Sequence, residues 1–282
     1  MKKVSILGVP EHFNFPWQLA IDEGAFEERG IDLEWTDVPE GTGKMSKMLE
    51  NGEADLAVML TEGTVKSMAD GNPIKIVQEF IVSPLLWGIH VGAKSGFKEV
   101  SELRNATVAI SRFGSGSHLM AFVHAREQGW DTTKLKFLVV NDMKGAIDAL
   151  ENGTADYFMW EHFMTKPLVD NGTFRRLGDC PTPWPCFVIV AHERFIREQA
   201  GILGHILQTI NAYTEEFRNI PSIDRTLANA YGQQLEDIRK WLSLTQWSTS
   251  QIRTATLMGV QQRLMELALI HEIRPAQDLV HS

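Results

Sequence analysis

Short hydrophobic runs alternate with helix-like spacing along most of the chain. Runs such as VSILGVP (4–10), LAVML (56–60) and YFMW (157–160) predict β-strands, and helical stretches separate them. Strands that alternate with helices indicate parallel sheets with right-handed crossovers. Past residue 195 the spacing is helical to the end of the chain, in ILGHILQTINAYTEEF (202–217), LEDIRKWLSL (235–244) and LMGVQQRLMELALIHEI (257–273).

The chain contains an internal repeat. Residues 49–55 read LENGEAD and residues 150–156 read LENGTAD, so six of seven positions are identical at an offset of 101. In each copy a helix ends at Asn-Gly, where glycine tolerates the left-handed conformation, and a short apolar strand follows. The same offset places VSILGVP opposite NATVAIS (105–111). The repeat predicts two lobes, each opening with the order β-α-β-α-β.

Two apolar segments run between the lobes, at 80–93 and 186–195. Two crossings of this kind indicate that the second lobe is inserted into the first. We predict a discontinuous first lobe of residues 1–86 and 190–282, which includes the C-terminal helices. The inserted second lobe is predicted to span residues 87–189.

Composition and charge exclude some classes of function. The 282 residues are 44% hydrophobic, which is enough for a large buried core, and the formal net charge is −9. An acidic chain without a basic segment is not expected to bind nucleic acid. No apolar run approaches the roughly 20 residues needed to cross a bilayer. The N-terminus lacks a signal peptide, so we expect a cytoplasmic protein as the chain is written, or a periplasmic one if a leader has been trimmed from it.

The two cysteines, Cys180 and Cys186, lie in the proline-rich stretch CPTPWPC. Their spacing matches no zinc signature, and a zinc site would need two further ligands. We expect two reduced thiols on a loop, and a disulfide only in an oxidising compartment. No metal site and no cofactor is expected.

In parallel α/β sheets, ligands bind beyond the carboxyl ends of the strands. That rule selects four loops, 11–17 and 61–64 in the first lobe and 111–118 and 161–165 in the second. The stretch ISRFGSGSH (110–118) carries no nucleotide-binding signature, because both GK[ST] and a third glycine are missing. Its glycines let the backbone approach a ligand, and free amides at the following helix start would attract a carboxylate, sulfonate or phosphate.

Charged and hydroxyl side chains follow the strands of both lobes. Ser115 or Ser117 is expected to cap the helix, and Arg112 to hold an anion through a bidentate contact. An ordinary capped turn with Arg112 in solvent is the alternative. Glu62 and Glu161, if they line the site, would repel a simple oxyanion and suit a ligand with amine, amidine or ring N–H donors. The alternative is that both point to solvent.

Aromatic side chains accompany these polar groups. Phe13, Phe15 and Trp17 either wall the cleft or pack in the core. Trp184 stands between two prolines near one crossing, as a rigid wall of the pocket or as a structural residue. The predicted ligand-binding residues are His12, Phe13, Asn14, Phe15, Thr61, Glu62, Ser83, Ser111, Arg112, Gly114, Ser115, Gly116, Ser117, His118, Trp160, Glu161 and Trp184.

The stretch FPWQLAIDEGAFEERGIDLEW (15–35) resembles the opening of periplasmic-type solute-binding proteins of the nitrate/sulfonate/taurine and thiamine-pyrimidine-precursor group. The passage G-x-F-x-x-x-G-I-D-L from Gly24 is followed by G-x-x-D-L-A from Gly52. The second lobe adds L-R-x-x-x-V-A-I-S, which ends at Ser111 and is followed by GSGS. The resemblance covers most of residues 4–195.

The resemblance implies an α/β fold of the type II periplasmic-binding-protein kind. Each lobe would be a mostly parallel sheet flanked by helices, and a two-strand hinge would let the lobes close on a small ligand. It also implies delivery of that ligand to an ABC permease. The alternatives are a ligand sensor that acts on another protein, or a cytoplasmic enzyme of pyrimidine or menaquinone-precursor metabolism on the same scaffold. The enzyme's acid–base candidates would be His12, Glu62, His118, Glu161 and His162.

Overall fold

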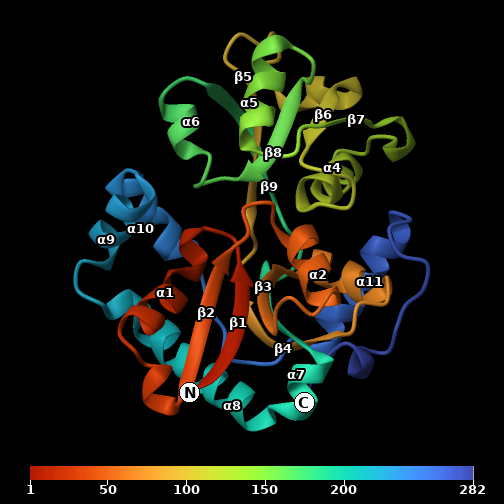
Figure 1. The fold of residues 1–282 in the computed structure, drawn as a ribbon. Coiled ribbons are helices and arrows are strands. Elements are labelled where there is room, and N and C mark those ends of the chain that lie inside the picture. The colour runs from red at the N-terminus through yellow and green to blue at the C-terminus, as the bar shows by residue number, and fades with distance from the viewer. Residues whose placement is uncertain (282) are drawn as a thin grey trace. The chain divides into compact units, whose positions relative to one another are not determined.

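A computed structural model describes residues 1–281 of the chain. The chain divides into two compact units. Unit 1 consists of Met1–Ser83 and the segment from Trp184 onward, and unit 2 is the inserted segment Pro84–Pro183. Each unit is built on one five-stranded sheet with helices on both faces (Figure 1).

The sheet of unit 1 has the strand order β2-β1-β3-β10-β4. β1 pairs in parallel with both β2 and β3, whereas β10 runs antiparallel between β3 and β4. Phe187–Ile189, which the sequence pattern assigns to the second lobe, therefore lie in this sheet. The strands are β1 (Lys2–Gly8), β2 (Ile31–Asp37), β3 (Leu56–Leu60), β4 (Ile74–Ile81) and β10 (Phe187–His192).

Helices cover both faces of this sheet because their apolar stripes pack on it. Met45 and Leu49, four residues apart in α2, are both fully buried. α1 packs with α8 on one face, and α2, α3 and α11 lie together on the other (Figure 1). The helices are α1 (Phe15–Asp22), α2 (Thr42–Glu50), α3 (Thr61–Ala69), α7 (Glu193–Glu198), α8 (Ala200–Glu216), α9 (Ile223–Tyr231), α10 (Leu235–Leu244) and α11 (Thr254–Glu266).

The sheet of unit 2 has the order β7-β6-β8-β5-β9, with parallel pairing around β6 and antiparallel pairing around β5. Ala146, Ala149 and Leu150 of α5 pack with Phe158 and Phe174 in its core. The elements are β5 (Leu86–Gly92), β6 (Thr107–Ile110), β7 (Lys136–Val139), β8 (Tyr157–Glu161), β9 (Phe174–Pro181), α4 (Gly116–Glu127), α5 (Met143–Asn152) and α6 (Lys166–Asp170).

The repeat corresponds to equivalent structure in the two units. The first copy ends α2 and leads into β3, and the second ends α5 and leads into β8. Gly52 and Gly153 both adopt the left-handed conformation, with φ of 71° and 69°. The predicted glycine-terminated helices are thus confirmed. The predicted β-α-β-α-β order opens unit 1, whereas in unit 2 it runs from β6 to β8 and follows the additional strand β5.

The prediction of helix to the end of the chain is wrong beyond α11. That helix ends at Glu266, and Ala268 adopts a positive φ of 56°. Among residues 267–281, the segment after it forms a short 3-10 turn, η6 (Ala276–Asp278). Val280 then forms a parallel bridge with Ile76. Apolar spacing in LALIHEI instead falls on a turn and irregular segment, in which Leu267 and Ile270 are buried and Ile273 is exposed.

The last residues shield the outer edge of β4. The Ile76 N–H donates to the Leu279 carbonyl at 2.9 Å, and the His281 N–H donates to the Ile76 carbonyl at 2.9 Å. Further along β4, the Glu79 N–H donates to the Ser250 carbonyl at 2.9 Å. The backbone groups of this edge strand thus find partners within the same chain.

Both cysteines are buried free thiols. Cys180 lies in β9, so the prediction of a loop is wrong for it, and Cys186 directly precedes β10. Burial, with the Glu127 carboxylate nearby, raises the pKa of the Cys180 thiol. The thiol therefore stays protonated at neutral pH.

We expect Gly153→Ala to lower the free energy of unfolding by roughly 1 to 2 kcal/mol, because a left-handed backbone is unfavourable for alanine. The new Cβ would meet nothing within 4 Å, so the cost is conformational alone. Gly259→Ala, in the exposed interior of α11 and equally free of contacts, should be neutral or stabilising by up to about 1 kcal/mol. Urea unfolding measures both changes, and equal effects would contradict this account.

Candidate functional site

Unit 1 gathers polar side chains at the carboxyl edge of its sheet. β1 and β3 are parallel neighbours, so the segments that follow them start side by side. The first continues as the 3-10 turn η1 (His12–Asn14) and then α1, which has Pro16 in its first turn. The second enters α3 directly at Thr61. The predicted loops 11–17 and 61–64 are therefore mostly helical.

Buried polar atoms without a hydrogen-bond partner concentrate at this edge. His12 and Glu62 are both 0% exposed. Within residues 1–281, neither ring nitrogen of His12 nor Oε1 of Glu62 has a partner. The same holds for Asn14 Oδ1, Thr61 Oγ1 and Thr64 Oγ1. Buried polar groups in proteins are nearly always paired, so a concentration of unpaired ones is typical of a binding site.

Trp184, the tryptophan between two prolines, holds one carboxylate oxygen of Glu62. The Trp184 indole Nε1–H donates to Glu62 Oε2 at 2.7 Å, and both side chains are buried. The Thr61 N–H donates to the Cys186 carbonyl at 3.0 Å, which ties the start of α3 to the same returning segment. One carboxylate oxygen is thus fixed, and the other is left for a different partner.

Burial controls the protonation of this edge. Desolvation raises the pKa of Glu62 to about 7, although hydrogen bonds from its own backbone N–H and from Trp184 oppose the rise. Burial likewise raises the pKa of Glu11 to about 7. The pKa of His12 falls to about 3 for the same reason, so its imidazole is neutral at neutral pH. The edge therefore offers a neutral ring and two carboxyl groups that ionise near neutrality.

The aromatic residues of this region divide between the site edge and the core. Trp17 is fully buried and stacks on Phe26 with ring centroids 6.1 Å apart. Phe13 is buried against Phe187, at 5.3 Å between centroids. Phe15 is half-buried in α1 and packs on Tyr231 and Phe217. These contacts give Trp17 and Phe13 packing roles.

Ser83 lies where the chain leaves unit 1, beside the point where it returns. The Cys186 N–H donates to the Ser83 carbonyl at 3.3 Å. The Ser83 hydroxyl accepts from the Gln246 N–H at 3.1 Å. Both polar groups of Ser83 thus bind neighbouring backbone, so the residue holds the two crossing segments and the segment after α10 together.

In unit 2 the stretch between β6 and α4 forms a compact capped turn. Gly114 has a φ of 79°, which a residue with a side chain rarely adopts. Ser115 is the N-cap of α4 and accepts from the His118 N–H at 3.4 Å, so the predicted capping by Ser115 or Ser117 is confirmed for Ser115. The Ser117 hydroxyl instead accepts from the Ser111 N–H at 3.0 Å.

The start of α4 has the electrostatics of an anion site. The amides of Gly116 and Ser117 open the helix, and amides in a first helical turn have no carbonyl partner within the helix. The helix dipole adds positive potential at that end. The half-buried Arg112 lies in the same turn, and its carbonyl accepts from the Ser115 hydroxyl at 2.7 Å.

His118 anchors this turn. Its Nδ1 accepts from the Gly114 N–H at 3.0 Å. The ring packs edge-on against Phe113, Phe122 and Phe137, with centroids 4.8 to 5.3 Å away. An aromatic cluster and one backbone hydrogen bond therefore fix the ring, which gives His118 a role in shaping the loop.

Trp160 and Glu161 close β8 and have different surroundings. Trp160 stacks on Phe158 with ring centroids 5.4 Å apart and meets Trp87 edge-on at 6.3 Å. It thus belongs to the aromatic packing of unit 2. Glu161 is buried, and its Oε2 accepts from the Met164 N–H at 2.6 Å, so it folds the turn 161–165 back on itself.

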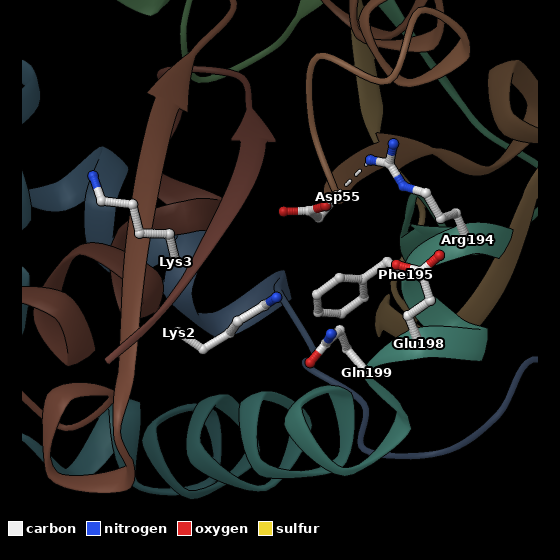
Figure 2. A pocket seen from close by; sticks show the side chains of 7 residues that line it. All are labelled: Lys2, Lys3, Asp55, Arg194, Phe195, Glu198 and Gln199. Carbon is white, nitrogen blue, oxygen red and sulfur yellow. Dashed lines mark ion pairs between the residues drawn. The ribbon is translucent and has the colours of Figure 1, made fainter.

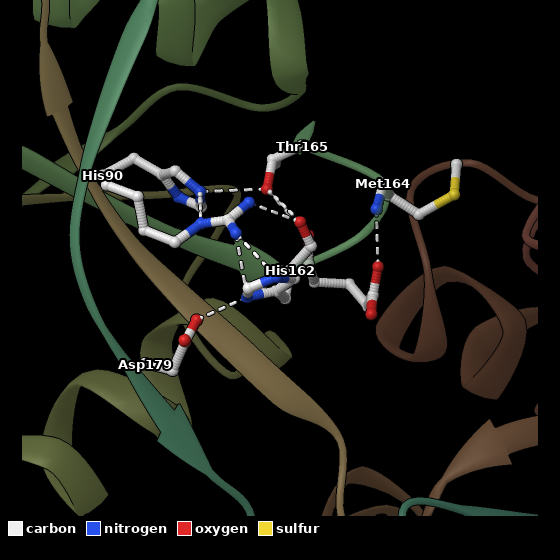
Figure 3. A network of polar contacts seen from close by, with 7 residues as sticks. His90, His162, Met164, Thr165 and Asp179 are labelled. Atoms are coloured by element: carbon white, nitrogen blue, oxygen red, sulfur yellow. Dashed lines mark hydrogen bonds and ion pairs between the residues drawn. The ribbon is translucent and has the colours of Figure 1, made fainter. Parts of the chain in front are cut away.

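A polar network fixes this turn to β5 and β9 (Figure 3). Arg176 donates through Nη2 to the His162 carbonyl at 2.6 Å and through Nε to His90 Nε2 at 3.3 Å. Thr165 Oγ1 lies 2.9 Å from His90 Nε2 and donates to the carbonyl that precedes His162. His162 Nδ1 lies 2.7 Å from Asp179 Oδ1.

The charges of this network are set by burial and by Arg176. Burial, followed by the guanidinium of Arg176, lowers the pKa of His90 to about 3. Burial alone would raise the pKa of Asp179, but the hydrogen bond from His162 and the nearby cations outweigh it and lower that pKa. A neutral His90 and an ionised Asp179 then hold Arg176 in place at neutral pH.

A surface cavity of about 220 Å³ lies at the opposite, amino edge of the unit 1 sheet (Figure 2). The carboxylate of Asp55 there already accepts from the Ser5 N–H at 3.0 Å and lies 3.9 Å from the Arg194 guanidinium. Asp55 and Arg194 in this cavity therefore partly neutralise each other. The lining residues are Lys2, Lys3, Asp55, Arg194, Phe195, Glu198 and Gln199.

Several residues that shape these regions were not predicted from the sequence. Thr64 repeats the hydroxyl of Thr61 one turn later in α3, a helical spacing that is visible in the sequence. His90, Thr165 and Arg176 meet only because β5, β9 and the turn after β8 are brought together by antiparallel pairing. No local motif marks them.

Two further features bear on function. Among residues 1–281, no helix is both long enough and apolar enough to cross a bilayer. Over the same residues, no group of three or more His, Cys, Asp or Glu side chains is arranged to hold a metal ion.

Residues 87–180, which make up most of unit 2, match the family model for Ca3427-like PBP, where PBP denotes periplasmic binding protein. The structure of the Candida albicans CA3427 gene product, described as having the generic periplasmic-binding-protein fold, is similar over the whole chain. Its TM-score is 0.91 at 22% identity, covering 100% of this chain and 96% of that one. The chain has the periplasmic-binding-protein fold.

Two ligand-binding proteins share this fold. The alkanesulfonate-binding protein SsuA from Xanthomonas axonopodis pv. citri, bound to MOPS, has a TM-score of 0.83 at 18% identity, covering 100% of this chain and 98% of that one. The periplasmic nitrate-binding protein NrtA from Synechocystis PCC 6803 has a TM-score of 0.75 at 13% identity, covering 99% and 84%. No curated protein sequence matches the chain.

The periplasmic-binding-protein fold confirms the α/β class and the resemblance inferred from the sequence. Solute-binding proteins are among the structures that share this fold. They do not identify its ligand, because at such identities the likeness concerns the fold.

We expect Glu62→Gln to gain stability relative to the wild type as pH rises. A pKa raised from 4.5 to about 7 means that the folded protein loses stability when Glu62 must ionise, above pH 4.5 and through pH 7. Glutamine cannot ionise and can still accept from Trp184. The variant's free energy of unfolding should therefore rise by about 2 to 3 kcal/mol against the wild type between about pH 5 and about pH 8.

Urea unfolding at the two pH values measures this difference. Glu50→Gln, at the exposed end of α2, removes the same charge from the surface and is the control. A Glu62→Gln difference that is the same at both pH values would show that Glu62 is not a desolvated acid.

Proposed function

We propose that this chain is a non-catalytic small-molecule binding protein whose two units close on their ligand. The observation that supports this most directly is the set of buried, unpaired polar atoms at the carboxyl edge of unit 1, on His12, Asn14, Thr61 and Glu62. Burying such groups without hydrogen bonds lowers the stability of the folded protein, and a ligand that forms those hydrogen bonds removes the penalty. No nucleophile–base pair is needed for this role.

The second part of the proposed site is the capped turn of unit 2. Arg112 and the first amides of α4, at Gly116 and Ser117, form a second set of groups, suited to an anion. We propose that hinge motion at the two crossing segments brings this turn over a ligand seated on unit 1. The closed state is favoured only by the extra contacts that it makes with ligand.

The proposed ligand class is a small anion, a zwitterion or a heteroaromatic compound. The sulfonate- and nitrate-binding structures that share the fold support a sulfonate or a nitrate-like anion. The sequence resemblance to the thiamine-pyrimidine-precursor group supports a pyrimidine precursor as well. The same likeness supports delivery to an ABC permease as the biological role.

An enzyme on the same scaffold is the second candidate. It is favoured by the carboxyl groups of Glu11 and Glu62, whose pKa values of about 7 suit acid–base chemistry at neutral pH. Mass spectrometry of a bound ligand after prolonged incubation separates the two functions. Conversion of the ligand would favour the enzyme, and recovery of unchanged ligand would favour the binding protein.

We expect a thermal-shift screen of sulfonates, pyrimidines and small carboxylates to contain a stabilising ligand. Stabilisation should grow with the logarithm of ligand concentration. Arg112→Ala should weaken binding of the best hit roughly tenfold to a hundredfold, since a charged hydrogen bond is lost. Arg104→Ala, at an exposed position before β6, is the control. Unchanged binding by Arg112→Ala would show that this arginine does not contact the ligand.

We expect saturating ligand to reduce the radius of gyration measured by small-angle X-ray scattering, because closure makes the molecule more compact. The unliganded and liganded samples are matched in concentration and buffer. An unchanged radius together with tight binding would contradict hinge closure and would leave binding to one unit alone.

A further inference from the structure

The carboxyl group of Glu62 is a buried acid that the protein itself leaves half paired. Its Oε2 accepts from the Trp184 indole at 2.7 Å, and its Oε1 has no partner among residues 1–281. The residue is 0% exposed, so solvent does not reach this second oxygen. The arrangement fixes the plane of the carboxylate and directs one acceptor to whatever occupies the site.

Glu62 also lacks a compensating cation. The groups that influence its ionisation are burial, its own backbone N–H and the Trp184 indole, and no lysine, arginine or histidine of the described chain is among them. A buried carboxylate without a counter-charge is strongly disfavoured unless a partner neutralises it. A cation that arrives with the ligand would supply that partner.

The residues around Glu62 add acceptors and one neutral ring. The hydroxyls of Thr61 and Thr64 lie on the first turns of α3 and are unpaired, and each can accept as well as donate. His12, in the 3-10 turn that follows the neighbouring strand β1, is a neutral imidazole that offers one acceptor nitrogen. A ligand with several N–H donors would satisfy this set, whereas a bare oxyanion would face a carboxylate.

We propose that Glu62, oriented by Trp184, recognises a positively charged nitrogen group of the ligand, an amine or amidine, through Oε1. This inference rests on the proposed binding function and narrows its ligand class to compounds that carry an N–H cation. An anionic group on the same molecule would be bound by the turn of unit 2. Unsubstituted oxyanions such as nitrate or simple sulfonates are then poor ligands.

Two matched pairs of probes test the inference by isothermal titration calorimetry. The aliphatic pair is 2-aminoethanesulfonate and ethanesulfonate, and the aromatic pair is 4-amidinobenzoate and 4-methylbenzoate. Each pair keeps the anion and changes only the nitrogen group. We expect the nitrogen-bearing member of at least one pair to bind roughly tenfold to a hundredfold more tightly than its partner, as charge-assisted hydrogen bonds do.

The variant Glu62→Gln should abolish that preference. Its amide can still accept from Trp184, but it then presents an NH₂ donor where the carboxylate presented an acceptor. Affinity for the nitrogen-bearing probe should fall roughly tenfold or more, and the probe without nitrogen should bind as well as before or better. Glu79→Gln removes another buried carboxyl group of unit 1, which binds Ser248, and should leave the preference intact.

The pH dependence of wild-type binding gives a second, independent readout. If Oε1 accepts from a cation, affinity should rise about tenfold between about pH 6 and about pH 8 as Glu62 ionises. If a protonated Glu62 donates to an oxyanion instead, affinity should fall over the same range, which would overturn the inference. Glu11 at the same edge also has a pKa raised to about 7, so the rise is assigned to Glu62 only if Glu11→Gln retains it, and loss of the rise in Glu11→Gln would overturn the inference.

The failures of the inference and of the proposed function are distinguishable. The inference is overturned if neither nitrogen-bearing probe binds, or if both pairs bind without preference, whatever the wider screen shows. The proposed function is overturned only if no compound of the wider screen stabilises the protein. Equal loss of preference in Glu62→Gln and Glu79→Gln would also overturn the inference, because any buried carboxyl group would then have the same effect.

Discussion

The parallel pairing of β1 with β3, repeated by β6 with β8, is the constraint on which the candidate sites depend. Parallel neighbours end at the same sheet edge, so each unit gathers there the starts of the segments that follow its strands. The first backbone amides of a helix lack carbonyl partners within the helix, and polar side chains near the helix start bind them. The polar groups of both units therefore concentrate at this edge of each sheet.

In unit 1 this places ionisable side chains where burial disfavours their charged forms. Hydrophobic packing around the sheet buries Glu62 and His12 completely, and this burial disfavours the charged form of each, raising the pKa of Glu62 and lowering that of His12. The Trp184 indole offsets part of the burial of Glu62. In unit 2 Arg176 binds the His162 carbonyl, and the His162 ring binds Asp179, so the charged groups of the network have partners within the chain. The two edges thus differ, since the Arg176 network pairs its groups with one another, whereas Oε1 of Glu62 has no partner among residues 1–281.

Much of this organisation could be predicted from the sequence because it is local. The LENG repeat marks two equivalent helix ends, and Gly52 and Gly153 both adopt the expected left-handed backbone. What escaped prediction depends on distant pairing. The Glu62–Trp184 bond spans 122 positions, and β10 joins the first sheet only through antiparallel pairing with β3 and β4. The tail after α11 shares its apolar spacing with a helix, but the chain turns at Ala268, and only its later residue Val280 bridges β4, at Ile76.

That tail has a consequence for the behaviour of the molecule in concentrated solution. An uncovered outer strand is a template on which a second chain can add its own strand, and such edge-to-edge growth leads to aggregates. Here the residues up to His281 occupy the backbone groups of Ile76. Removal of these few residues by a carboxypeptidase would leave the outward backbone N–H and C=O groups of Ile76 in β4 unpaired, while the rest of the fold stays intact. Self-association through this strand would then follow without unfolding.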